Sequence, residues 1–161
     1  MRHHMRRMDK AISDVEEMKK ILMSTEYVTI AMSKDNEPYM VSLSHGYDEA
    51  NNCIYFHCVK EGKKLDYLKS NNAVWGQALL DHGYRQGECT HLYASVHFKG
   101  RVTLLMDPDE KLRALSLMAR RLDGDPERLI SGWRPERLVE TVVGRIDIEY
   151  MTGKKSKEVT V

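Results

Sequence analysis

The chain has 161 residues, which is enough to bury one core and too short for two ordinary domains, so one domain over residues 1–161 is expected. Hydrophobic residues at 42% and charged residues at 30% are typical of globular proteins and exclude a disordered or fibrous chain. The 25 basic and 24 acidic side chains give a formal net charge of +1, so no net field attracts nucleic acid or a membrane surface. No apolar stretch reaches the roughly 18 residues that span a bilayer, and a cytoplasmic protein is expected.

The cysteines and the N-terminus carry no expected function. Cys53, Cys58 and Cys89 are odd in number and lack CxxC spacing, which argues against a disulfide framework and a thiolate zinc site. We therefore expect reduced thiols and no metal. The opening MRHHMRRMDK, residues 1–10, is charged without a following apolar segment and is expected to be mobile.

A helix and three meandering strands are expected in the first part of the chain. Ser13 and Glu16 have the spacing of a capping box, and apolar residues then recur at helical intervals up to residue 24. Residues rich in β-branched and aromatic side chains, separated by polar turns, follow this helix. The expected strands are YVTIAMS (27–33), PYMVSLSHGY (38–47) and CIYFHCV (53–59).

The second part of the chain alternates strands and helices. The expected elements are a short helix in 61–72, a strand over 73–80, an exposed polar loop over 81–91, a long strand over 92–105 and a final strand over 138–151. Asp107 before Pro108 predicts a helix start, and apolar residues from Leu112 to Leu122 form its stripe. Six strands joined mainly by turns predict an α+β, mainly β domain built on an antiparallel sheet or small barrel.

The segment FHCVKEGKKL, residues 56–65, is the strongest candidate for a binding site. A strand end meets a glycine and the start of a short helix carrying Lys60, Lys63 and Lys64. Free amides at a helix N-terminus and nearby ammonium groups suit a phosphate group. Taken by itself, a lysine-bearing turn is more often a solvated surface.

Several blocks together resemble the pyridoxamine 5'-phosphate oxidase-related flavoproteins, in particular the nitroimidazole-resistance (Nim) subgroup. The matching blocks are MRRMDKAI, PYMVSLSHGYD, IYFHCVKEGKKLDYLKSN, CTHLYASVHFKGRV followed by DPDEKLRAL, and IEYMTGKKS. The resemblance implies a six-stranded antiparallel split β-barrel with flanking helices. It also implies a homodimer that binds FMN in clefts between its protomers.

The resemblance also assigns residues to the FMN site. Lys63 and Lys64 would bind the phosphate, and the remaining positions would lie along the flavin ring or line the same cleft. Those remaining positions are Val41, Ser42, Leu43, Phe56, His57, Cys58, Ser95 and Val96.

The chain departs from the family at the second expected strand. Many Nim-like proteins carry proline, asparagine and tyrosine near the places held here by Ser42, Ser44 and His45. Alternation along a strand puts the two serines on one face and Leu43 and His45 on the other, and one of these faces should look into the cleft. His45 is the candidate proton donor because imidazole titrates near neutrality. The C-terminal GKKSKEVTV lacks the arginine-rich phosphate site of the vitamin B6 oxidases, so oxidation of that vitamin is not expected.

Two functions follow from the resemblance. In the first, FMN takes electrons from a nicotinamide, NAD(P)H, or another donor and reduces a small nitroaromatic or quinone-like acceptor, so that the protein is an FMN-dependent oxidoreductase. In the alternative, the same cleft belongs to a non-catalytic module that stores flavin, senses redox state, or holds haem or a deazaflavin.

Overall fold

A computed structural model gives the structure of residues 5–161, with the side chains of residues 135, 137 and 139 left undescribed. The strands are β1 (Ala11–Ile12), β2 (Tyr27–Lys34), β3 (Glu37–Ser44), β4 (Gly46–Asp48), β5 (Cys53–Cys58), β6 (Ala73–Arg85), β7 (Thr90–Leu104) and β8 (Val142–Lys155). The helices are α1 (Val15–Ser24), α2 (Lys63–Ser70), α3 (Pro108–Leu122) and α4 (Pro126–Ser131), with 3₁₀ turns η1 (Met8–Lys10) and η2 (Pro135–Glu140). The N-terminal segment 1–10 was expected to be mobile, and residues 1–4 of it lie outside the described part of the chain.

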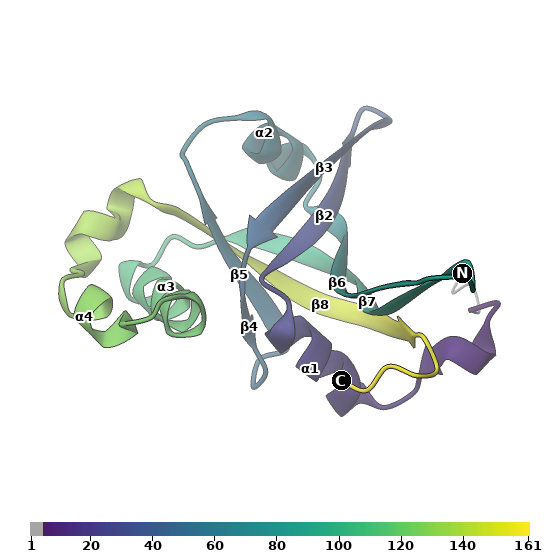
Figure 1. Ribbon diagram of the computed structural model, residues 1–161. Helices are drawn as coiled ribbons and strands as arrows, with labels where there is room; N and C mark the ends of the chain where they lie inside the picture. The colour runs from purple at the N-terminus through teal and green to yellow at the C-terminus, as the bar shows by residue number, and fades with distance from the viewer. Residues whose placement is uncertain (1–4) are drawn as a thin grey trace.

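The strands form one antiparallel sheet that curls on itself (Figure 1). The strand order is β3-β2-β6-β7-β8-β5-β4, and β1 pairs with β8 beside this path. Although β3 and β5 lie near opposite ends of this order, the curl brings them close together. The expected α+β, mainly β fold with a split barrel and flanking helices is confirmed, with β1 and β4 added to the six long strands.

One of the expected strands is divided in two. Residues 38–47 form β3 and β4 with His45 between them, and β3 pairs with β2 while β4 pairs with β5. The chain therefore passes at His45 from one edge of the sheet to the other. The position is tightly packed, since a Cβ on Gly46 would lie 2.4 Å from Leu117 Cδ2.

His45 is fully buried at this corner. Its Nε2 lies 2.9 Å from the carbonyl oxygen of Leu22, and Arg121 Nη1 donates to the His45 carbonyl oxygen at 2.7 Å. The ring is neutral with its proton on Nε2, because Nε2 must donate to that oxygen and Nδ1 faces the Arg121 guanidinium at 3.5 Å. Burial, opposed by the Leu22 hydrogen bond and aided by Arg121, lowers the pKa of His45 to about 4.

The low pKa of His45 predicts acid sensitivity. The unfolded chain takes up the imidazole proton near pH 6.5 and the folded chain only near pH 4, so stability should fall as pH falls between these values. The full shift in the pKa of His45 corresponds to a decrease of about 3 kcal/mol at most in the free energy of unfolding. Urea unfolding at several pH values should show this slope in the native protein and a shallower one in His45→Gln, whose amide can donate to Leu22. Equal slopes in both proteins would contradict the assignment.

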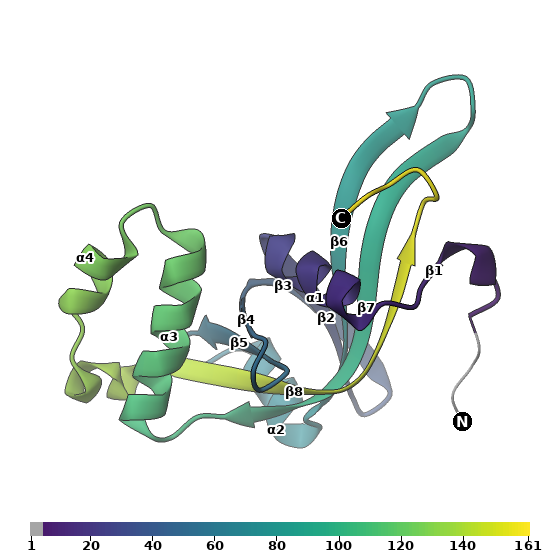
Figure 2. The ribbon, with the colours of Figure 1, turned by 90° about the horizontal axis from the view of Figure 1, so that it is seen from below.

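The expected loop over residues 81–91 is a continuation of the β6–β7 hairpin. β6 runs to Arg85 and β7 begins at Thr90, so the turn itself contains four residues, 86–89. In Figure 2 this hairpin projects beyond the rest of the sheet. Its residues are polar because neither face of the projecting arm is buried, and the alternation that predicts a half-buried strand is therefore missing. Gly83 at φ +84° accompanies a register shift within the arm.

The three expected helices, α1, α2 and α3, begin close to their expected positions, with one correction at the cap of α1. The cap of α1 is Asp14, whose side chain accepts a hydrogen bond from Glu16 N at 3.0 Å, and Ser13 lies outside the helix. The cap of α3 is Asp107, as expected, which accepts from the amides of Asp109 and Glu110. None of the described helices is long and apolar enough to cross a membrane.

Candidate functional site

The split in the barrel leaves two strand edges without strand partners. β3 is the last strand at its end of the sheet, and none of the described strands pairs with its outer edge. β5 pairs with β8 over Cys53–Cys58, whereas β4 covers the other edge only over Cys53–Tyr55. The backbone of Phe56–Cys58 thus has a free edge at the split. The amides and carbonyls of such edges are available to a ligand.

Helix α2 closes one end of the split. Leu65, Tyr67 and Leu68 are buried in the barrel, while the N-terminus of the helix stays exposed (Figure 1). Its N-cap is Gly62, with φ 135° and ψ 166°, and no side chain caps the first turn. The amides of this turn therefore remain available as donors, at the end of the helix where the dipole favours an anion.

Lys63 connects α2 to β3. Its Nζ lies 3.1 Å from Glu37 Oε1 and stands 4.9 Å from the ring centre of Tyr39 and 5.3 Å from that of Tyr67. The hydrogen bond with Glu37 raises the pKa of Lys63 and lowers the pKa of Glu37, so both groups are charged at neutral pH. Glu37, Tyr39 and Tyr67 were not among the residues expected at the site. Tyr39 could have been found from strand alternation, because it lies on the same face of β3 as Val41 and Leu43.

Lys64 connects α2 to β5. Its Nζ lies 5.5 Å from the ring centre of Phe56. Burial raises the pKa of the Cys58 thiol, and the positive charge of Lys64 opposes part of this rise. The two lysines thus lie on the two sides of the split beside the uncapped first turn of α2, with Lys63 paired to the Glu37 carboxylate and Lys64 near the Phe56 ring.

The remaining candidates on β3 face in two directions. Ser42 is exposed on the outer face of the sheet, where its hydroxyl lies 2.9 Å from that of Thr29. Leu43 is buried in the barrel core, and Val41 packs against that core. The serine face is therefore the accessible one, and the chain can offer its β3 edge or its Ser42 side to a ligand.

The candidates on β5 and β7 are divided in the same way. Phe56 and Val96 are fully buried, whereas His57 is exposed. Ser95 is buried and donates to the Lys154 carbonyl oxygen at 3.3 Å. β2 and β6 separate β7 from β3, and β8 separates it from β5, so Ser95 and Val96 lie on a strand that does not border the split.

The buried position of His45 bears on its candidate role. A neutral ring that is bonded to a backbone carbonyl and fully buried serves to hold the β3–β4 corner. No part of the ring reaches solvent, so the structure gives it no route to deliver a proton to a ligand.

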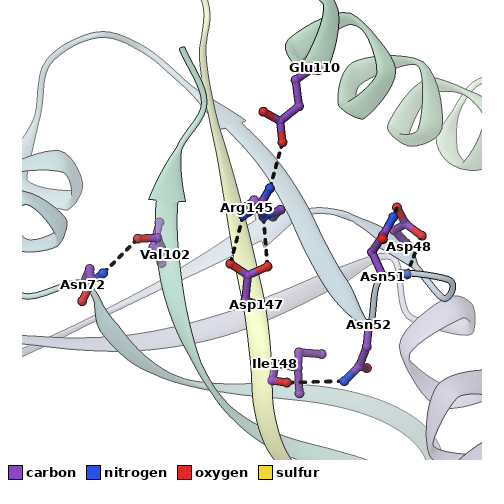
Figure 3. Close-up of polar contacts among 9 residues, drawn as sticks. All are labelled: Asp48, Asn51, Asn52, Asn72, Val102, Glu110, Arg145, Asp147 and Ile148. Atoms are coloured by element: carbon purple, nitrogen blue, oxygen red, sulfur yellow. Dashed lines mark hydrogen bonds and ion pairs between the residues drawn. The ribbon is translucent and has the colours of Figure 1, made fainter. Parts of the chain in front are cut away.

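A cavity of about 550 Å³ lies between α3 and the β5–β8 face of the sheet. Arg145 Nη1 donates to Glu110 Oε1 at 2.8 Å and its Nε donates to Asp147 Oδ1 at 2.9 Å, while Asn51 donates to Asp48 (Figure 3). The Arg145 guanidinium is thus paired with two carboxylates, those of Glu110 and Asp147. The network joins α3 to β8 and is suited to a structural role.

Comparisons with known proteins agree with this architecture. Residues 14–155 match the family model described as pyridoxamine 5'-phosphate oxidase, and the chain belongs to this family. No curated protein matches the sequence.

Solved structures extend the similarity over nearly the whole chain. A candidate 5-nitroimidazole antibiotic resistance protein from Bacteroides thetaiotaomicron has a TM-score of 0.78 at 23% identity, with 95% of each chain covered. An FAD-binding protein from Mesorhizobium loti has a TM-score of 0.67 at 25% identity, with 92% of this chain and 98% of that chain covered. A flavocytochrome from Azotobacter vinelandii has a TM-score of 0.77 at 21% identity, with 99% of this chain and 75% of that chain covered.

Proposed function

We propose that the protein is an FMN-binding oxidoreductase whose cofactor occupies the split between β3 and β5. The observation that carries the proposal is the uncapped first turn of α2 with Lys63 and Lys64 beside it. Backbone amides, helix dipole and two ammonium groups together fit a phosphate dianion. The flavin-binding proteins among the structural relatives support the choice of a flavin.

The free strand edges fit the flavin ring. Its pyrimidine end carries hydrogen-bond donors and acceptors in one plane, which the backbone of Phe56–Cys58 can pair with as a neighbouring strand would. When bound, FMN would take two electrons from a nicotinamide and pass them to a small acceptor; reduction of a quinone to a hydroquinone also consumes two protons. The protein residues bind the phosphate, orient the ring and exclude water from one side of it.

An absorption spectrum tests this function. The purified protein, incubated with FMN and desalted, should keep a flavin spectrum that bleaches with NADPH or NADH under argon and returns on addition of menadione. A flavin spectrum that neither nicotinamide bleaches would favour the storage or sensing alternative. A colourless protein would remove the proposed cofactor.

We also propose that the protein is a homodimer. Tyr27, Met40, Trp75 and Leu79 leave about half or more of their surface exposed on the outer face of β3, β2 and β6. The strand register puts Met40 and Trp75 on either side of Ala31, so these side chains form one apolar patch. Ser42 is exposed on the same face, so a partner seated there would lie over Ser42.

The patch predicts the effect of added charge. Light scattering should give twice the chain mass for the native protein and the single-chain mass for Trp75→Lys with Leu79→Lys, because a charge cannot be buried there without a partner. Met106→Lys is the control, since Met106 is 84% exposed outside the patch. A native monomer that retains FMN would overturn the dimer.

A further inference from the structure

A groove of about 390 Å³ lies on the side of β5 that faces the helices α3 and α4. Its lining includes His57, Leu115, Met118, Leu129, Trp133 and Leu138. In Figure 1 these helices stand beside β5, away from the projecting hairpin. The groove is therefore separate from the split, with β5 between them.

The walls of the groove are apolar although part of them meets water. Leu122 on α3 is 46% exposed and Leu129 on α4 is 42% exposed. Trp133 adds an aromatic wall, and aromatic rings pack well against such a surface. A cavity of this size with apolar walls and few polar groups is typical of a small-molecule site.

The polar lining limits the charge of a ligand. His57, Asp123 and Thr141 are the polar residues among the described lining side chains, and Asp123 is the acidic one. A carboxylate or sulfonate on the ligand would be repelled by the Asp123 carboxylate. The described lining residues include no lysine or arginine that could offset this repulsion. The groove therefore favours a neutral ligand over an anionic one.

His57 connects the groove with the proposed flavin site. It lines the groove, and it lies within Phe56–Cys58, the part of β5 that has a free edge at the split. A molecule in the groove near His57 would therefore lie next to a ring bound along this edge. We propose that the groove binds the electron acceptor and that the acceptor is a neutral aromatic compound; this inference rests on the proposed function.

The test uses the FMN-loaded protein and two probes, menadione and its anionic 3-sulfonate. Isothermal titration calorimetry should show menadione binding at least about tenfold more tightly than the sulfonate. Leu122→Gln with Leu129→Gln should weaken menadione binding about tenfold or more, because the apolar contacts of both walls are lost. Met23→Gln on α1 is the matched control, since Met23 is also 42% exposed and does not line the groove.

The outcomes separate the groove from the flavin. Unchanged menadione binding in the Leu122/Leu129 variant, or equal affinity for both probes, would overturn the acceptor groove while the flavin spectrum stands. If the protein keeps no FMN but still binds menadione, and this binding depends on the two leucines, the groove is a site for neutral aromatic compounds. The proposed oxidoreductase function would then be wrong. A change of the variant from dimer to monomer would show that the groove is a subunit contact and would overturn the proposal.

Discussion

Replacing Lys63 and Lys64 together with alanine should weaken FMN binding at least tenfold. Each ammonium group can form a charge-assisted hydrogen bond to phosphate worth roughly 1.5 to 3 kcal/mol. Part of this gain is offset because Lys63 must exchange its contact with Glu37, 3.1 Å away, for the phosphate. Fluorescence titration of FMN with the native and variant proteins measures the loss.

Riboflavin is the sharpest control for this variant. It has the same ring as FMN and no phosphate, so its affinity should be the same in both proteins. Lys69→Ala tests the general effect of charge, because Lys69 is exposed in the last turn of the same helix. Equal FMN affinity in the native and double-alanine proteins would place the phosphate elsewhere.

Gly144→Ala should destabilise the protein by about 3 kcal/mol or more, which lowers the melting temperature by roughly 6 to 12 °C in a chain of this size. Gly144 pairs with Phe56 across β8 and β5, and the phenylalanine ring lies over it. A Cβ at Gly144 would stand 2.2 Å from Phe56 Cζ, and because the ring is fully buried in a close-packed core it can move only by displacing its neighbours.

Two further variants isolate this packing. Gly124→Ala should leave stability nearly unchanged, because a Cβ at Gly124 meets nothing within 4 Å. The double variant Phe56→Leu with Gly144→Ala should lose less stability than the two single variants lose in sum, because the smaller leucine side chain removes the clash with the alanine Cβ. Calorimetric melting curves that show strict additivity would contradict the predicted contact. Phe98 over Gly76 repeats the arrangement across β7 and β6, where a Cβ would stand 2.0 Å from Phe98 Cζ.

Local patterns in the sequence were sufficient for most of the elements. Alternation in CIYFHCV puts Tyr55 and His57 on one face of β5 and Ile54, Phe56 and Cys58 on the other, because side chains of a strand alternate. The pair Asp107 and Pro108 marks the start of α3. The aspartate carboxylate can accept hydrogen bonds from the unpaired amides of the first turn, and proline has no amide hydrogen that would need a partner there. The GKK segment marks the start of α2, and the uncapped turn with its lysines follows from these few residues.

Contacts between distant segments decided what the local patterns could not. The break at His45 depends on Leu22 and Arg121, and the projecting hairpin lacks the buried face that produces a recognisable alternation. The free edge of Phe56–Cys58 exists because β4 ends early, and the groove beside it requires α3, α4 and β5 to meet. The sequence by itself thus determined the six long strands, most of the helix starts and the lysine-bearing start of α2. Tertiary structure decided which edges and walls are open to a ligand, because openness depends on which distant segments fail to cover them.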